Sequence, residues 1–232
     1  MPAAPHTLSV FDDELEQLRA LVCEMGGRVE EAIGEAVGAL VHCDRPRART
    51  VLDSDGRIDA LAARIEKEAV HLIALRSPLA DDLRDVLAAF KIAGIIARMG
   101  DCAANIALRA AATGDCRAVP HLHSIEGMSG AVLAMVKSAL DAFATRNPDA
   151  ADRVAGMDDS VDRHQAALFS ALVDHMAEDT SSIPMVAHLL LVSQKLERIG
   201  DHAVAIADMV RFAAIGRAGR MATWDAAPGW AA

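Results

Sequence analysis

The two halves of this 232-residue chain repeat one another, and the repeat limits the folds open to it. Residues 25–29 (MGGRV) align with residues 128–132 (MSGAV) at an offset of 103 (128 − 25). Residues 98–101 (RMGD) align with residues 198–201 (RIGD) at an offset of 100 (198 − 98). An internal repeat of this length predicts two similar domains, related by a pseudo-twofold axis.

Each half contains three long segments with the apolar period of an α-helix, separated by Pro, Gly, Asp or Asn. Aromatic residues make up only 3% of the chain and tyrosine is absent, which favours helix over sheet. The predicted helices cover residues 9–43, 46–75, 79–113, 118–145, 148–177 and 183–215.

Short connections between these helices predict an all-α fold of two tandem three-helix bundles, with six long antiparallel helices. We expect the first three-helix repeat at residues 8–115 and the second at residues 116–215. Residues 216–232 lose the helical period, and we expect them to form a flexible tail.

The charge of the chain excludes one large class of partners. Its formal net charge is −10 and its pI is near 5.3, whereas nucleic-acid binding requires clustered Lys and Arg. An acidic surface suits basic proteins or cations. The chain also has no nucleophile beside a base, no Gly-rich phosphate loop and no nucleotide fingerprint, so no enzyme activity is expected.

Cysteine spacing and hydropathy indicate a cytoplasmic protein. The four cysteines include no C-x-x-C pair, and the N-terminus lacks the basic and apolar regions of a signal peptide. The longest strongly apolar stretch, near residues 183–193, is shorter than the roughly 20 residues that cross a bilayer. No direct membrane insertion is therefore expected.

Two carboxylates interrupt the apolar stripe of the last predicted helix. The positions that recur there at spacings of three and four are Val186, Leu190, Ser193, Glu197, Asp201 and Val204. Burial of an unpaired carboxylate is costly, and like charges four residues apart disfavour a helix. A cation is therefore expected opposite Glu197 and Asp201.

The second helix of each repeat carries a matching pair, Asp55 with Asp59 and Asp158 with Asp162. If the second and third helices of a repeat face each other, four carboxylates converge. Clusters of oxygen ligands bind Mg²⁺, Ca²⁺, Mn²⁺ or iron. The alternative is that Arg98 and Arg198 form ion pairs with the aspartates three residues later, and that the other aspartates are helix caps or solvated.

Two motifs resemble the PhoU family. Residues 195–204 (KLERIGDHAV) resemble its L-E-R-I-G-D segment, and residues 76–84 (RSPLADDLR) resemble its R-Q-P-x-A-x-D-L-R turn. The resemblance covers about residues 8–215. It implies a pair of three-helix bundles, a homodimer or higher homo-oligomer, and E/D-x-x-x-D motifs that ligate multinuclear metal clusters. The metal, which could be iron, zinc, manganese, magnesium or calcium, stays open.

The same resemblance implies a role. Members of the family act between the ATPase subunit of a phosphate ABC transporter and the sensor histidine kinase of the phosphate-starvation response. When phosphate is plentiful they keep that response off. The chain is therefore expected to be a negative regulator and a metal-binding adaptor.

One residue departs from the family pattern, because Ala97 stands where the first repeat usually carries Glu. We therefore expect an intact second site and a weaker or empty first site. The expected ligands of the second site are Glu197, Asp201, Asp158 and Asp162, and those of the first are Asp101, Asp55 and Asp59.

Two alternatives remain open at this point. A ferritin-like di-iron protein needs two E-x-x-H pairs and two further glutamates, but Glu68 with His71 is the only such pair in the sequence. A metal-free helical scaffold would leave the repeated carboxylates as ordinary surface charge.

Overall fold

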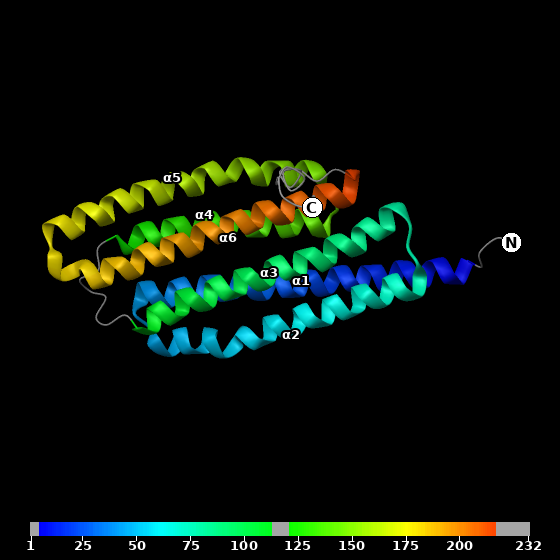
Figure 1. The fold of residues 1–232 in the computed structure, drawn as a ribbon, viewed down its shortest axis with the longest axis horizontal. Coiled ribbons are helices and arrows are strands. Elements are labelled where there is room, and N and C mark those ends of the chain that lie inside the picture. The colour runs from blue at the N-terminus through cyan, green and yellow to red at the C-terminus, as the bar shows by residue number, and fades with distance from the viewer. Residues whose placement is uncertain (1–4, 113–120, 217–232) are drawn as a thin grey trace, which may run out of the picture.

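The computed structural model describes residues 5–112 and 121–216, and within these ranges it is helical with no strand (Figure 1). The predicted all-α fold is confirmed. The long helices are α1 (Pro5–His42), α2 (Arg45–Arg76), α3 (Ala80–Ala112), α4 (Leu122–Ala144), α5 (Pro148–Glu178) and α6 (Ile183–Ile215). A single 3₁₀ turn, η2 (Thr180–Ser182), precedes α6.

Local sequence explains where these helices begin and end. Asp44 caps α2 by accepting a hydrogen bond from the backbone N–H of Arg47 at 2.9 Å, and Asn147 caps α5 in the same way. Both helices have proline in the first turn, where its missing N–H costs nothing. Helix α2 ends at Arg76, and Ser77 follows as its C-cap in a left-handed conformation.

Some predicted boundaries cannot be compared with the structure. The predicted start of the fourth helix at residue 118 and the boundary between residues 115 and 116 lie outside the described residues. So does the predicted tail, apart from Gly216.

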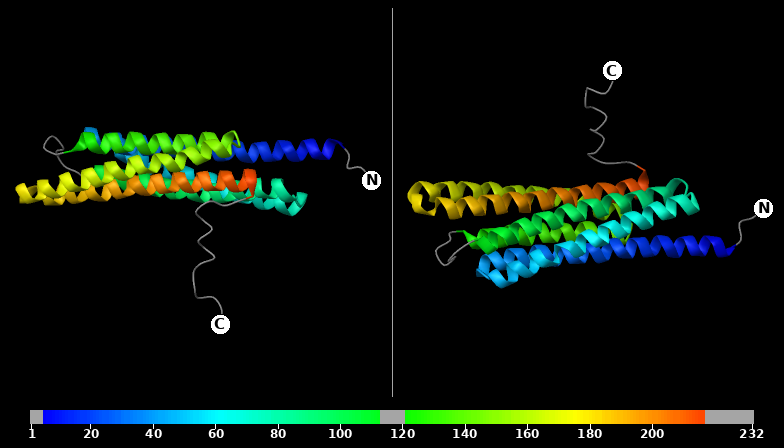
Figure 2. Two further views of the ribbon diagram at one scale, coloured as in Figure 1. Left: turned by 90° about the horizontal axis from the view of Figure 1, so that it is seen from above. Right: turned by 60° about the horizontal axis from the view of Figure 1, so that its bottom comes forward.

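The helices form two three-helix bundles that lie side by side. Helices α1, α2 and α3 contact one another, as do α4, α5 and α6. The two repeats meet where α3 packs against α6 and α1 packs against α4 (Figures 1 and 2). The N-terminal end of α1 projects beyond the α2–α3 turn, and the α5–α6 turn projects at the opposite end (Figure 2).

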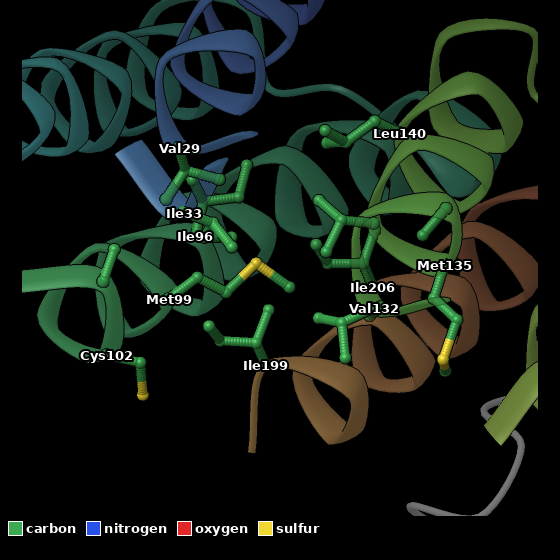
Figure 3. Close-up of a cluster of buried hydrophobic side chains, with 14 of the residues drawn as sticks. Val29, Ile33, Ile96, Met99, Cys102, Val132, Met135, Leu140, Ile199 and Ile206 are labelled. Atoms are coloured by element: carbon green, nitrogen blue, oxygen red, sulfur yellow. The ribbon is translucent and has the colours of Figure 1, made fainter. Parts of the chain in front are cut away.

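The interface between the repeats is an apolar core to which both contribute equivalent residues. Val29 of α1 and its repeat equivalent Val132 of α4 are both fully buried, as are Met99 of α3 and Ile199 of α6 (Figure 3). Burial of each such side chain contributes about 1.5–3 kcal/mol. The repeat therefore extends from the sequence into the core.

Helix α4 is long and apolar enough to cross a membrane by length and composition, a feature that the sequence analysis did not identify. Half of its most apolar 18-residue window is buried inside the protein, where it contacts α1, α5 and α6. A core helix of a soluble protein has the same properties. The expectation of no membrane insertion stays a prediction.

Candidate metal sites

The second-repeat cluster consists of Asp158 and Asp162 of α5 and Glu197 and Asp201 of α6. Residues four apart lie on one face of a helix, so each pair projects toward the α5–α6 contact. Burial raises the pKa of Glu197, and so do the negative charges of Asp201, Asp162 and Asp158. Carboxylates from two helices therefore gather around Glu197, as the sequence predicted.

The first-repeat cluster consists of Asp55 and Asp59 of α2 and Asp101 of α3. Burial raises the pKa of Asp55, and the charges of Asp59 and Asp101 raise it further. The structure thus brings these three aspartates together at the equivalent place. Ala97 lies half-buried one turn before Asp101, so a methyl group occupies the position of Glu197.

A glycine in the third helix of each repeat brings that helix close to a carboxylate. A Cβ atom on Gly200 would lie 3.7 Å from Oδ1 of Asp158, and one on Gly100 would lie 3.7 Å from Oδ1 of Asp55. These glycines cost helix stability relative to alanine. At Gly100 close helix approach offsets part of this cost, since a Cβ atom would lie 3.3 Å from Ile58, whereas at Gly200 a Cβ atom would meet ordinary contact distances.

The clusters are gathered carboxylates rather than formed coordination spheres. Over residues 5–112 and 121–216, no three His, Cys, Asp or Glu side chains stand close enough together to hold a metal ion. Asp162 and Asp201 are exposed. Their donor atoms are all oxygen, which suits hard cations. Metal ligation remains a prediction for all seven residues.

The alternative to a metal site, in which these carboxylates form ion pairs, cap helices or are solvated, finds limited support. In the described part of the chain, no ion pair joins Arg98 to Asp101 or Arg198 to Asp201. The four aspartates of α2 and α5 lie inside their helices and do not cap them. Of the metal-free explanation, only the solvation of the exposed carboxylates remains.

Sequence reasoning missed one buried charge outside the clusters. Asp85 of α3 is 5% exposed, and among the described residues it is the one charged side chain that is buried. Its Oδ2 lies 2.7 Å from Nη2 of Arg146 and 3.5 Å from Nη2 of Arg19. Burial raises the pKa of Asp85, against the opposing effect of the two arginines. Since Arg146 follows α4, this ion pair joins the two repeats.

Comparison with known proteins adds independent findings. The family model for the PhoU domain matches residues 22–110 and 125–210. A phosphate-specific transport system accessory protein PhoU homolog of Zymomonas mobilis is 44% identical over 212 residues, covering 91% of this chain and 90% of the relative. A homolog of the same name from Caulobacter vibrioides is 40% identical, covering 89% and 90%.

Two solved structures share the fold. The crystal structure of PhoU from Pseudomonas aeruginosa matches with a TM-score of 0.84 at 35% identity, covering 89% of this chain and all of that one. The crystal structure of the phosphate transport system regulatory protein PhoU from Streptococcus pneumoniae has the same TM-score at 26% identity. It covers 90% of this chain and 99% of that one.

Proposed function

Since this chain belongs to the PhoU family, whose members are named as accessory and regulatory proteins and not as enzymes, we propose that it is a negative regulator of phosphate uptake and phosphate-starvation signalling. The match spans both repeats and about nine-tenths of the chain. It supports association with a phosphate transport system, and the acidic composition suits a regulator that binds other proteins.

The proposed mechanism is that of an adaptor. The chain, as a cytoplasmic homodimer, binds the ATPase subunit of a phosphate ABC transporter and a sensor histidine kinase. It shifts either partner only if it binds one conformation of that partner more tightly than the other. The long α-helices offer extended surfaces for such contacts, and no catalytic step is required.

We further propose that a metal, in a multinuclear cluster, occupies the second-repeat cluster. The crowding of carboxylates around Glu197 is the observation that carries this proposal. A bound cation would offset part of the negative charge of these carboxylates and hold α5 against α6. The first-repeat cluster, with Asp55, Asp59 and Asp101, would bind more weakly because Ala97 supplies no oxygen.

The test is metal content per chain, measured by mass spectrometry on protein purified without chelators or an affinity metal. Glu197→Ala combined with Asp201→Ala removes two of the four carboxylates of the second-repeat cluster and should abolish most bound metal. The matched control is Asp174→Ala with Glu178→Ala, which removes two exposed carboxylates four residues apart elsewhere on α5. The control should retain the metal of the wild type.

The outcomes separate the alternatives. Metal retained in the Glu197/Asp201 variant would overturn the assignment of the second-repeat cluster. Absence of metal from every protein would leave a helical adaptor whose carboxylates are structural. The ferritin-like alternative gains nothing from the structure, because Glu68 and His71 line a groove between α1 and α2 and do not face a second E-x-x-H pair.

The regulatory role has its own test. A phosphate-starvation reporter should be active at high phosphate in a host strain that lacks this chain, and the wild-type chain should silence it. A reporter that stays active when the chain is restored would contradict negative regulation, whatever the metal content.

A further inference from the structure

An apolar groove runs between α5 and α6 on the surface of the second repeat. Its volume is about 410 Å³. The residues that line it are Gln165, Ala166, Phe169, Leu190, Ser193 and Gln194. Phe169 is 56% exposed, which is unusual for a large aromatic side chain, and Val173 one turn further along α5 is 43% exposed.

The groove lies on the same helix faces as the second-repeat cluster. Along α5, Ala166 and Phe169 lie four and seven residues after Asp162, and these spacings keep one helix face. Along α6, Leu190 lies seven residues before Glu197. Seven residues of helix span about 10 Å at a rise of 1.5 Å per residue. One face of α5 and α6 therefore carries acidic groups at one end and an apolar groove at the other.

The fold does not require an aromatic residue at the position of Phe169. The first repeat has Glu66 at the position of Phe169 (169 − 103), and Glu66 is exposed on α2. Both features that distinguish the second repeat, Phe169 and Glu197, lie on the same face. The first repeat keeps exposed apolar side chains at the positions of Leu190 and Val173, namely Phe90 and Val70, so the aromatic residue at position 169 is what distinguishes the groove of the second repeat.

The shape of the groove suits a helix. Helices α5 and α6 are long, antiparallel neighbours, and the main contacts of α5 among the described helices are with α4, α6 and η2. Figure 1 shows α5 along the outer edge of the molecule. A further helix laid along this groove would place its own apolar stripe against Phe169 and Leu190, as helices do in amphipathic recognition.

We propose that the α5–α6 groove is the docking site for a basic amphipathic helix of a partner protein. A large apolar side chain of that helix enters between Phe169 and Leu190, and a Lys or Arg about 10 Å away faces the second-repeat cluster. Charge favours such a partner over a second copy of this chain, whose net charge is also −10. The inference deepens the proposed adaptor function and rests on it for the existence of a partner.

The test uses the full chain and a defined probe. The probe is a synthetic, fluorescently labelled 18-residue helical peptide with Leu along one face and Lys beside it. A second peptide carries Glu in place of each Lys. Fluorescence anisotropy should show that the Lys peptide binds the wild type and that the Glu peptide binds at least about tenfold more weakly, because like charges repel at the cluster.

Two substitutions locate the binding. Phe169→Glu introduces the residue that the first repeat has and should weaken the Lys peptide at least about tenfold. Val70→Glu is the matched control, since Val70 is 59% exposed on α2 and is the repeat equivalent of Val173. It should leave binding unchanged. Circular dichroism and the unfolding midpoint should be the same for both variants.

Several results would overturn the inference. These are no binding of the Lys peptide to the wild type, equal binding of the two peptides, or equal losses in the two variants. Sedimentation that shows a wild-type dimer and a Phe169→Glu monomer would assign the groove to a second copy of the chain instead.

The reporter separates this inference from the proposed function. If the wild type silences the phosphate-starvation reporter and Phe169→Glu silences it equally, the groove is not the regulatory docking site and the inference fails alone. If the wild type fails to silence it, the proposed function fails while peptide binding is judged by its own result.

Discussion

The two repeats share their interior but differ on the face that carries the carboxylates. In the core, Val29 and Val132 are the same residue at equivalent positions, and both are fully buried. On the carboxylate face, Glu197 corresponds to Ala97 and Phe169 corresponds to Glu66. Buried positions are held by close packing, whereas exposed positions change without loss of the fold.

This difference concerns the number of candidate metal ligands in each repeat. The second-repeat cluster has four carboxylates beside an apolar groove, and the first-repeat cluster has three carboxylates beside a charged residue. Duplication of a three-helix unit supplies two scaffolds of the same shape. The second repeat carries the larger set of groups proposed to bind cations, and the first repeat carries one carboxylate fewer because Ala97 replaces Glu.

The largest expected effect comes from restoring the missing carboxylate. Ala97→Glu would give the first repeat the set of oxygen ligands that the second repeat has. Loss of even an outer partner of a metal site commonly costs 10–100-fold in affinity, so a direct ligand should raise metal affinity at the first repeat by about that factor. Calorimetric titration with Mn²⁺ on chelator-treated protein measures it.

The control for that titration is Ala97→Gln, which adds similar bulk with one neutral oxygen. It should gain much less affinity than the Glu variant. Equal gains in the two variants, or no gain in either, would show that the first repeat lacks more than one carboxylate and that the clusters differ in geometry.

Most of the fold could be predicted from the sequence, because the helical period and its interruptions by Pro and Asn are local signals. Asp44 and Asn147 lie between the predicted helices, and each caps the helix that follows it. Helical spacing could also have indicated the burial of Asp85, since Asp85 lies three and seven residues before the buried residues Ala88 and Ile92 on the same helix face. Its partner Arg146 is distant in sequence, and only the tertiary structure brings the two together.

The candidate sites could be predicted only in part. Spacing of four residues identified the carboxylate pairs, and the structure brings the pairs of neighbouring helices together. Spacing does not fix side-chain rotamers, so it could not show that no three ligands stand at metal distance in the described residues. Residue spacing could not predict the groove at Phe169 either, because its walls come from two helices.

A smaller effect is expected from the glycine beside each cluster. Gly200→Ala should stabilise the protein by about 0.5–1 kcal/mol, since alanine favours helix and its Cβ would meet Asp158, Val161 and Met135 at ordinary contact distances. Gly100→Ala should change stability little, because its Cβ would lie 3.3 Å from two side-chain carbons of buried Ile58. Urea unfolding of chelator-treated protein measures both. A larger gain from Gly100→Ala would show that the first repeat is the more loosely packed.

The smallest expected effect is the dependence of stability on pH. Burial and neighbouring acids raise the pKa of Glu197 in the folded protein, so the folded state binds a proton that the unfolded chain has already released. Stability of the metal-free protein therefore falls as pH rises from about the ordinary value of 4.5 through the folded pKa. Glu197→Gln removes that loss. The Glu197→Gln variant should be more stable than the wild type at pH 7 by about 0.2–0.5 kcal/mol, a like-charge effect limited by solvent, and equal to it near pH 4.

The Asp55→Asn variant should gain less stability than Glu197→Gln, because two acids raise the pKa of Asp55 and three raise that of Glu197. Urea unfolding across this pH range would contradict the comparison if Asp55→Asn gained as much, since the two clusters would then be equally crowded despite Ala97.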